Sequence, residues 1–365
     1  MSSSAMALTK WKINMKSIRI DTHDTERGEI TTYELINASG ASVKLSSLGA
    51  GILEIKVPDR DGNLADVVLG YKDLNDYFFD GPCAGKVPGR FANRICKGHF
   101  ELDGKSYQLN CNHQGKHHLH GGNVGFQNKI WDCEMDGSDT VVFSLESPNG
   151  DENYPGNLTA RVAYTWSDDN VLKIALGAVT DAPTVLNLTN HTYFNMAGEE
   201  KEGTALNQVL QLNCSHYLET DADLIPTGVI APVKGTPMDF TTPKVIGRDI
   251  KLDFTALNYG KGYDNCWVID GYEDEDVHLA AVLCDEKSGR VVEISTDQPA
   301  AQVYTGNWLE GCPVSKSGKN YHDYDGVAIE CQGMPDAPNH DNFSNQVLRP
   351  DEEYRRIILF DFKVR

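Results

Sequence analysis

A glutamate at the end of an apolar run is the side chain of this sequence best suited to do chemistry. Glu330 closes the stretch 326–330, in which Val327, Ala328 and Ile329 are typical of a buried strand. A carboxylate at the rim of such a strand costs free energy unless it is paired or functional. We therefore interpret Glu330 as a functional residue rather than as a surface charge.

A histidine surrounded by neutral hydrogen-bonding groups is the second candidate. The segment Asn187–Asn195 combines amide, hydroxyl and phenol groups around His191. A single histidine is more often a satisfied structural residue than a catalyst. Here the density of neutral donors and acceptors makes a functional role of His191 as well supported as a structural one, because such groups suit a neutral, hydroxyl-rich ligand.

Two arginines and an amide form a third group. Arg90, Asn93 and Arg94 lie within five consecutive positions. Guanidinium groups are rigid donors that suit hydroxyls or a developing oxyanion, although surface charge is the ordinary role of such residues.

Two turn-like segments add hydrogen-bond acceptors. Asp264 follows a glycine turn and precedes a strand-like run, where it either forms an Asx-turn or accepts a ligand's hydrogen bond. The segment Gln298–Asn307 supplies further amides, among them Gln298 and Gln302.

The histidine-rich stretch 117–122 suggests a metal site at first sight. On an extended strand His118 and His120 would share one face. No cysteine or carboxylate stands at ligand spacing, so we disfavour a metal. His120 beside a Gly-Gly turn, where backbone can approach a ligand closely, is the better candidate, and we expect His113 and His117 to be exposed to solvent.

The elements that must position these groups are strands. Short runs of Val, Ile, Tyr, Phe and Thr alternate with polar residues and are broken by Gly, Asn, Asp or Pro. We predict one large antiparallel all-β domain over residues 1–365, with few short helices, a helical turn near 73–79 and a disordered N-terminal tail over residues 1–15. The predicted strands include 18–20, 31–35, 141–145, 171–176, 291–294 and 357–362.

Composition limits the partners. The 365 residues carry 33 Lys and Arg against 53 Asp and Glu, a formal net charge of −20, which disfavours nucleic acid and membrane surfaces. No apolar run approaches the about 20 residues of a membrane helix, and no signal peptide is visible. Nine cysteines without a C-x-x-C pair indicate a reducing cytoplasm rather than a disulfide framework. We expect a cytoplasmic monomer or weak homodimer.

Familiar cofactor motifs are absent. The sequence has no Walker A motif, no H-E-x-x-H and no G-x-S-x-G, and Gly49–Gly51 lacks the third glycine of a dinucleotide loop.

Several segments together resemble the aldose 1-epimerase (galactose mutarotase) family. They are, in the family's order, Gly89–Ile95, Leu119–Gly122, Leu188–Gly198, Gly262–Asp264, Gln298–Asn307 and Glu330–Asn339. Val347–Pro350 also resembles the family's C-terminal segment, so the resemblance covers nearly the whole chain. It implies a β-supersandwich and an isomerase that interconverts the α and β anomers of free aldohexoses such as galactose or glucose, with no cofactor and no metal.

The resemblance also implies roles by position. These are Glu330 as general base, His191 as general acid, His120 as a second histidine near the ring oxygen, and Asn93, Arg94, Asp264 and Gln298 as sugar-binding residues. The chain departs from the family at Asn265 and at Gly333–Met334, which bears on the shape of the pocket.

The implied mechanism sets a condition on protonation. Unperturbed Glu and His titrate near about 4.3 and 6.5. At neutral pH the base Glu330 must be ionised and the acid His191 protonated. We expect a nearby anion, Glu330 or Asp264, to hold the pKa of His191 up.

Three alternatives stay open. A glycoside hydrolase would use Glu330 and Asp264 as a carboxylate pair. A sugar-binding module would need no acid–base pair. A hexose-6-phosphate epimerase would need a cationic pocket, for which Arg90 and Arg94 are candidates.

Overall fold

Strands dominate the computed structural model, which describes residues 17–274 and 276–365. The tail expected over residues 1–15 lies outside the described residues. The one α-helix of the described residues is α1 (Thr255–Gly260), and the predicted turn near 73–79 is the first of the short 3₁₀ helices. These are η1 (Leu74–Tyr77), η2 (Cys96–Gly98), η3 (Phe126–Asn128), η4 (Asp151–Asn153), η5 (Ala205–Asn207), η6 (Ile246–Arg248), η7 (Tyr272–Asp274) and η8 (Ala337–Asn339).

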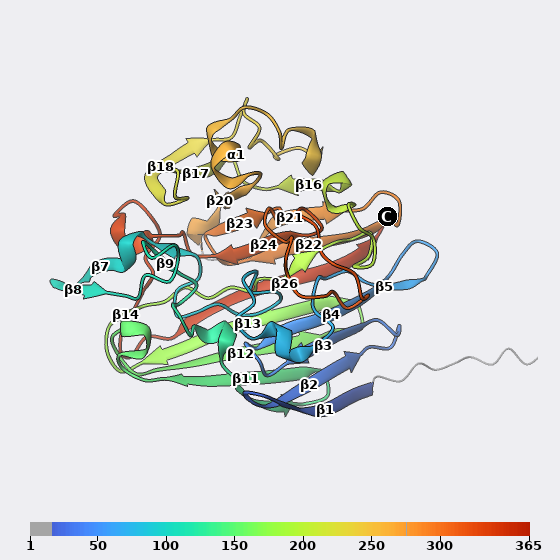
Figure 1. The fold of residues 1–365 in the computed structure, drawn as a ribbon, viewed down its shortest axis with the longest axis horizontal. Coiled ribbons are helices and arrows are strands. Elements are labelled where there is room, and N and C mark those ends of the chain that lie inside the picture. Colours follow the sequence, from blue (N-terminus) through green and yellow to red (C-terminus); the bar gives the residue numbers. More distant parts are fainter. Residues whose placement is uncertain (1–16, 275) are drawn as a thin grey trace, which may run out of the picture.

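The largest sheet has nine antiparallel strands, and β11, β12, β13 and β26 run side by side across the molecule (Figure 1). In sheet order the strands are β10 (Asp132–Asp136), β11 (Thr140–Ser147), β12 (Leu158–Trp166), β13 (Val171–Thr180), β26 (Tyr354–Val364), β22 (Arg290–Thr296), β21 (His278–Cys284), β16 (Val209–Leu212) and β19 (Lys244–Val245).

A five-stranded antiparallel sheet is formed by the N-terminal part of the chain. Its strands pair in chain order as a meander. They are β1 (Ser17–Thr25), β2 (Gly28–Ile36), β3 (Ser42–Ser46), β4 (Gly51–Pro58) and β5 (Leu64–Asp66).

A six-stranded sheet carries most of the polar segments described above. In sheet order its strands are β15 (Tyr193–Phe194), β24 (Val327–Gln332), β23 (Ala300–Tyr304), β20 (Asp264–Val268), β17 (His216–Thr220) and β18 (Pro226–Pro232). Three two-stranded sheets complete the fold: β6 (Arg94–Ile95) with β9 (His118–Leu119), β7 (His99–Leu102) with β8 (Lys105–Gln108), and β14 (Thr184–Val185) with β25 (Val347–Leu348).

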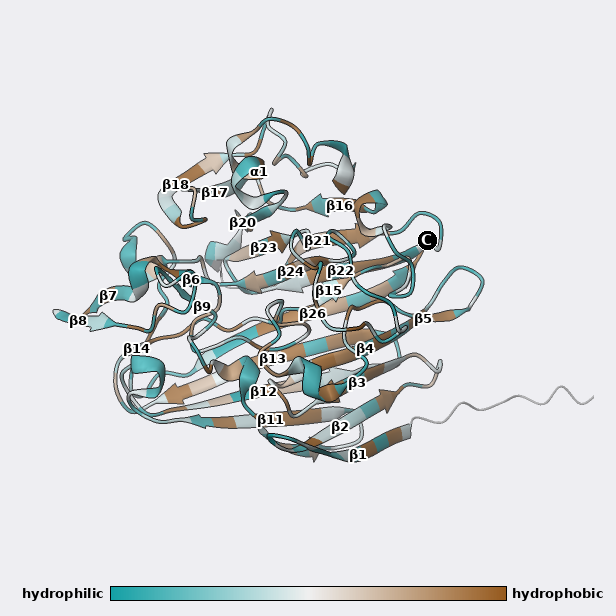
Figure 2. Cartoon of the chain, viewed as in Figure 1, coloured by the Kyte–Doolittle hydropathy of each residue, from teal (hydrophilic) through white to brown (hydrophobic). Residues whose placement is uncertain are grey.

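The core lies between the large sheets because apolar residues alternate along their strands. In β12 every second residue from Leu158 to Trp166 is buried, and the alternation is visible as changing colour along the strands of Figure 2. One apolar cluster joins Val43 of the five-stranded sheet, Val162 of the nine-stranded sheet and Trp267 of the six-stranded sheet. A shared core of this kind supports our proposal of one domain.

All the strands predicted from the sequence are confirmed. Each of the six predicted runs falls inside an observed strand, namely β1, β2, β11, β13, β22 and β26.

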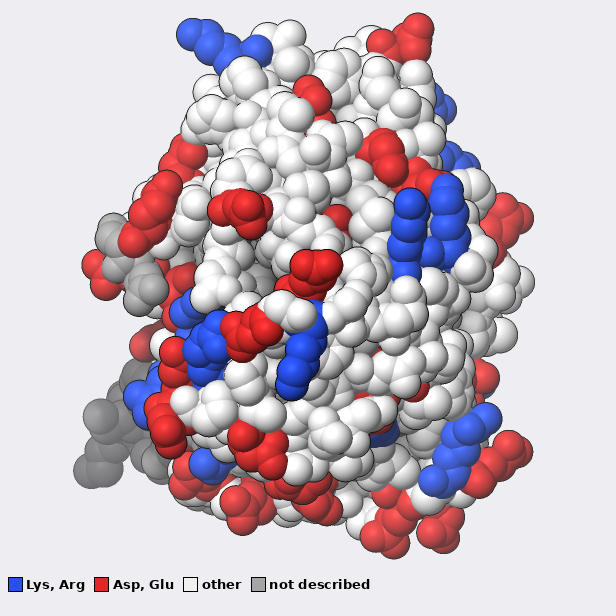
Figure 3. Space-filling view, turned by 90° about the vertical axis from the view of Figure 1, so that its left-hand side faces the viewer, with Lys and Arg blue, Asp and Glu red and all other residues white. Residues whose placement is uncertain are grey.

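On the face shown in Figure 3, acidic and basic side chains are interspersed over the surface. In the described part of the chain, no helix has the length and apolar character needed to cross a membrane.

Candidate active site

The register of the six-stranded sheet brings three polar side chains to one face. Gln302 in β23 lies directly opposite Glu330 in β24 and opposite Cys266 in β20. Asp264 stands two residues before Cys266 and therefore points to the same side. The alternate residues, such as Trp267, point to the apolar core.

This polar face forms part of the lining of a cavity of about 780 Å³, which we name the Glu330 cavity. Six of the seven predicted site residues line it: Asn93, Arg94, His120, His191, Asp264 and Glu330. They come from segments up to 237 residues apart, counted from 93 to 330. The fold thus gathers the separate polar segments around a single hollow.

A histidine and a carboxyl group meet in the cavity. His191 Nε2 lies 3.3 Å from Glu330 Oε1, and the two side chains are 6% and 2% exposed. The other polar atoms, Glu330 Oε2 and His191 Nδ1, are buried without a hydrogen-bond partner in the protein. Unpartnered buried polar atoms cost free energy, so both groups are available to form hydrogen bonds with a ligand.

The backbone on both sides fixes His191. Its N–H donates to the Lys86 carbonyl and its carbonyl accepts from the Gly85 N–H, both at 2.9 Å. The Lys86 ammonium is buried against the carboxylate of Asp80, with which it forms an ion pair. The position of the imidazole therefore depends on a segment about a hundred residues away in the chain.

Burial controls the protonation of the pair and corrects one expectation. Burial, together with the nearby Lys86 charge and against a backbone hydrogen bond that raises it, lowers the pKa of His191 to about 4. Burial also raises the pKa of Glu330, as does the Asp264 charge, against the opposing effect of Arg94. The carboxylates therefore do not hold the pKa of His191 up, because burial penalises both charged forms.

Asp264 is held by two donors. Gln302 Nε2 donates to Asp264 Oδ1 at 2.6 Å, and Arg94 Nη2 lies 3.4 Å from Asp264 Oδ2. The Asn93 amide oxygen accepts from the Arg94 N–H at 2.8 Å. Arg94 Nε has no partner in the protein. These groups offer donors and acceptors in fixed positions to a ligand with hydroxyl groups.

His120 has a defined tautomer. Its Nδ1 accepts from the backbone N–H of Asn93 at 3.1 Å, so in the neutral ring Nε2 carries the proton. Burial and the nearby His191 and Arg94 lower the pKa of His120, which favours this neutral form. His120 is therefore a hydrogen-bond donor at the cavity wall.

The Gly-Gly turn after His120 serves the backbone rather than a ligand. Gly121 has φ +79°, and a Cβ there would lie 1.6 Å from the Gly89 carbonyl oxygen. Only glycine allows this contact, which ties the turn to the segment that carries Asn93 and Arg94.

Gln298 is the predicted site residue that the structure does not bring to the cavity. Its buried amide donates to the Leu188 carbonyl at 2.9 Å, behind the segment that holds His191. Gln302 occupies the position that we expected of Gln298, because it stands opposite Glu330 and contacts Asp264. The strand pattern could have distinguished the two glutamines, since Gln302 lies inside a strand and Gln298 lies before it.

The expected exposure of His117 is wrong, and Arg90 does not suit the role that the 6-phosphate alternative would give it. His117 is buried rather than exposed, with Nδ1 accepting from the Lys97 N–H at 3.1 Å and Nε2 lying 3.5 Å from Asp223. Arg90 is also buried and donates to Ser147, so it cannot form a phosphate pocket. His113 does line the cavity and is partly exposed.

Among the described residues, no three His, Cys, Asp or Glu side chains come together in a way that could hold a metal ion.

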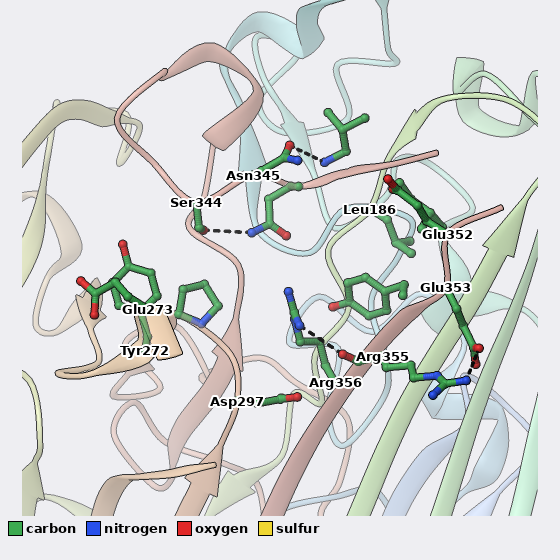
Figure 4. A pocket seen from close by; sticks show the side chains of 15 residues that line it. Leu186, Tyr272, Glu273, Asp297, Ser344, Asn345, Glu352, Glu353, Arg355 and Arg356 are labelled. Carbon is green, nitrogen blue, oxygen red and sulfur yellow. Dashed lines mark hydrogen bonds and ion pairs between the residues drawn. The ribbon is translucent and has the colours of Figure 1, made fainter. Parts of the chain in front are cut away.

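A second cavity, of about 760 Å³, lies along the start of β26, and we name it the Arg356 cavity. Several of its polar groups are bonded to one another: Glu353 pairs with Arg355 at 2.5 Å, and Arg356 Nη1 donates to the Arg355 carbonyl at 3.2 Å (Figure 4). No predicted site residue lines it.

Known aldose 1-epimerases are similar to this protein over nearly the whole chain. The family described as Aldose 1-epimerase matches residues 31–361. The galactose mutarotase of Homo sapiens is 40% identical over 322 residues, covering 88% of this chain and 91% of that protein. The aldose 1-epimerase of Haemophilus influenzae is 39% identical over 338 residues, covering 91% and 96%.

A solved structure shows the same architecture. The aldose epimerase homologue from C. elegans superposes with a TM-score of 0.82 at 30% identity, covering 91% of this chain and 98% of that one. The expected β-supersandwich is thereby confirmed.

Proposed function

The chain belongs to the aldose 1-epimerase family and is thus an isomerase of sugars, and we propose that Glu330 and His191 carry out its proton transfers on free aldohexoses such as galactose or glucose. The observation that carries this proposal is the 3.3 Å contact between His191 Nε2 and Glu330 Oε1 inside a polar cavity. Both groups keep one buried polar atom without a partner.

Interconversion of anomers needs two protons to move. To open the hemiacetal ring, a base removes the proton of the C1 hydroxyl and an acid gives a proton to the ring oxygen. Rotation about C1–C2 then exposes the other face of the aldehyde, and the same transfers in reverse close the ring. We assign the base to Glu330, whose free Oε2 is available to the C1 hydroxyl, and the acid to His191.

The pair needs one proton between its two members. The lowered pKa of His191 and the raised pKa of Glu330 favour a neutral imidazole beside a protonated carboxyl. Hydrogen bonds from sugar hydroxyls stabilise the carboxylate and so favour transfer of that proton to His191. The form with the proton on Glu330 and the form with the proton on His191 therefore carry the same number of protons. The two forms differ only in which side chain holds the proton.

The surrounding groups orient the sugar. His120 presents its Nε2 proton to the cavity, because Nδ1 is already bonded to Asn93. Arg94 and Asp264 supply a charged donor and acceptor for ring hydroxyls, and Gln302 keeps the Asp264 carboxylate in place. Such fixed groups reduce the entropy lost on reaching the reactive geometry.

The charge of the cavity argues against a phosphorylated substrate. Arg94 is the one Lys or Arg among the residues that line it, whereas Asp76, Asp223, Asp264 and Glu310 line it as carboxylates, besides the protonated Glu330 and the Asp80 that pairs with Lys86. A sugar phosphate would meet mostly negative charge there, so an uncharged sugar fits better. A glycoside hydrolase fits less well because Glu330 contacts the imidazole of His191 at 3.3 Å, a partner that a mechanism with two carboxylates does not need.

Polarimetry tests the proposal. Freshly dissolved α-D-glucose and α-D-galactose, followed with and without the protein at pH 7, are expected to reach the equilibrium rotation far faster with it. No acceleration with either sugar would contradict the proposal, and release of reducing sugar from aryl glycosides would favour a hydrolase. The cytoplasm as location and the monomer or weak homodimer remain predictions from the sequence.

A further inference from the structure

The phenol ring of Tyr193 packs against the histidine of the reacting pair. The ring centres of His191 and Tyr193 are 5.0 Å apart and the ring planes are inclined by 32°, so the two rings lie more nearly face to face than edge to face. Tyr193 is 1% exposed and lines the Glu330 cavity. The proton transfers proposed above use no atom of this side chain, so its place beside His191 needs a separate explanation.

The pairing of β15 with β24 produces this arrangement. Tyr193 stands opposite Ala328 in an antiparallel register. Continuing that register by two residues brings His191 to Glu330, in agreement with their 3.3 Å contact. The small residue opposite Tyr193 leaves room for the phenol ring to lie beside the imidazole. The fold thus gives His191 a carboxyl group at Nε2 and an aromatic ring against its face.

The Tyr193 ring is fixed before any proton moves. Its hydroxyl donates to the Pro82 carbonyl at 3.0 Å, and its ring meets that of Tyr304 edge to face, with the centres 6.0 Å apart. Burial raises the pKa of Tyr193, so the phenol stays neutral at working pH. A neutral aromatic face that is already held in one orientation loses little entropy when it acts on its neighbour.

Transfer of the shared proton to His191 creates a positive charge in a buried place. Burial opposes that charge, and so does the Lys86 ammonium, because both lower the pKa of the imidazole. The ring of His120 also contacts that of His191, with centres 5.3 Å apart, and stays neutral because its own pKa is lowered. The Glu330 carboxylate left by the transfer attracts the new charge at Nε2, on the edge of the imidazole. The face of the imidazole is covered by Tyr193.

We propose that Tyr193 is a positioning residue that stabilises the protonated form of His191 through the face of its ring. The negative face of an aromatic ring attracts a cation more strongly than it attracts a neutral imidazole. The contact therefore favours the state in which His191 carries the proton, together with the transition states on either side of that state. This inference rests on the proposed function, because it takes His191 to be the acid that gives its proton to the ring oxygen of the sugar.

A packing role alone makes a different prediction. Tyr193 belongs to an apolar cluster that includes Leu69 and Ala328, and a ring that only fills space there can be exchanged for any ring of similar size. A ring that stabilises a cation acts through the electron density of its face. Changing that density at constant shape therefore distinguishes the two roles.

The variant Tyr193→Phe, made with ordinary phenylalanine and with its fluorinated analogues, tests the inference. Ordinary phenylalanine loses only the bond to the Pro82 carbonyl and is expected to keep kcat for α-D-galactose within about twofold. Fluorine withdraws electron density from the ring face while the packing changes little. We expect 3,4,5-trifluorophenylalanine to lower kcat by about fivefold relative to phenylalanine, with KM within about twofold. We expect 4-fluorophenylalanine to give an intermediate kcat.

Titration of His191 itself gives a readout that packing does not change. In Glu330→Gln the imidazole titrates without its carboxyl partner, and NMR follows the nitrogen chemical shifts of its ring, which are assigned by their absence in His191→Asn. Adding the trifluorinated ring at position 193 is expected to lower the pKa of His191 by about 0.5–1 relative to adding Tyr193→Phe, because the cation loses its attraction to the ring.

Tyr107 provides a matched control. Its ring stacks on that of Phe100, with centres 5.2 Å apart, in an apolar cluster outside the Glu330 cavity. Tyr107→Phe, made with ordinary and with trifluorinated phenylalanine, is expected to leave both kcat and the pKa of His191 unchanged.

The two measurements separate this inference from the proposed function. Equal kcat and equal pKa of His191 for the plain and the fluorinated ring at position 193 overturn the inference, even if mutarotation is fast. A lower kcat with an unchanged pKa overturns it too, because the ring would then act on something other than the charge of His191. If the protein accelerates mutarotation of neither α-D-glucose nor α-D-galactose but the pKa still falls, the proposed function fails and the stabilisation of the cation by Tyr193 stands.

Discussion

The Glu330 cavity and the Arg356 cavity are nearly equal in volume, at about 780 and 760 Å³, and differ in what their polar groups do. In the Arg356 cavity, Glu353 pairs with Arg355 and the Arg356 guanidinium donates to a backbone carbonyl, and the Arg355 contact lowers the pKa of Glu353. In the Glu330 cavity, burial raises the pKa of the carboxyl group.

The difference shows what distinguishes a working site from a surface hollow. Of the described buried side-chain atoms that lack a hydrogen bond, three belong to residues lining the Glu330 cavity, in Arg94, His191 and Glu330, and none to residues lining the Arg356 cavity. A folded protein keeps such unpaired groups at a cost, which a ligand can repay by bonding to them. Size alone does not identify the site.

The largest expected effect comes from removing the acid–base pair. Glu330→Gln and His191→Asn are each expected to lower kcat by about 10²–10⁴-fold, because proton transfer in the transition state is lost. Glu353→Gln in the Arg356 cavity is the matched control and leaves kcat unchanged. Polarimetry on α-D-galactose measures all three variants. A near-normal kcat for Glu330→Gln or His191→Asn would show that the Glu330 cavity matters no more for catalysis than the Arg356 cavity does.

A smaller effect separates two glutamines near the same strand. Gln302→Leu is expected to lower kcat/KM by about tenfold, because the Asp264 carboxylate loses its 2.6 Å donor. Gln298→Leu leaves the Leu188 carbonyl without its donor, outside the cavity. It is expected to lower the free energy of unfolding by about 1 kcal/mol and to keep kcat/KM within about twofold. A tenfold loss of kcat/KM in Gln298→Leu, with little change in Gln302→Leu, would show that Gln298 and not Gln302 acts in the sugar site.

The pH dependence of kcat/KM follows from the pair's single proton. Below about 4, His191 and Glu330 are both protonated and no base remains, so the rate falls. Above the raised pKa of Glu330 neither group carries a proton and no acid remains, so the rate falls again. Polarimetry from pH 3 to pH 10 is expected to give a bell-shaped profile. A midpoint of the acid limb near 6.5 would mean that burial does not control His191.

The smallest expected effect is on stability. Glu330 has a higher pKa in the folded than in the unfolded state, so the folded protein binds more protons between these two values and stability falls as pH rises through them. The variant Glu330→Gln has no carboxyl group at this position and so does not lose this part of its stability as pH rises. We expect its Tm to exceed that of the natural chain by about 1–3 °C at pH 8, with little difference at pH 4. Scanning calorimetry at both pH values checks this, and a lower Tm at pH 8 would show that the carboxyl group stabilises the fold.

The fold was predictable because alternation is a local signal. The strands at 141–145, 171–176 and 357–362 follow from residue type alone and are observed. Glu330 was recognisable for the same reason, since a charged residue at the end of an apolar run breaks a pattern that can be seen without coordinates.

The rest needed information that the sequence does not display. Gln298 and Gln302 lie four positions apart, and only the pairing of β23 with β24 shows that Gln302 faces Glu330. His117 is buried through contacts with Lys97 and Asp223, the second of which is far away in the chain. The pKa of His191 depends on how deeply the cavity is buried, which no local pattern records.

The strands β20, β23 and β24 have Asp264, Gln302 and Glu330 on one side and the apolar core, with Trp267 and Val303, on the other. A sheet of this kind cannot loosen its working side while its inner side stays packed. Heating will therefore abolish turnover and cooperative structure at one common midpoint, so loss of activity on warming serves as a direct gauge of melting for the whole molecule.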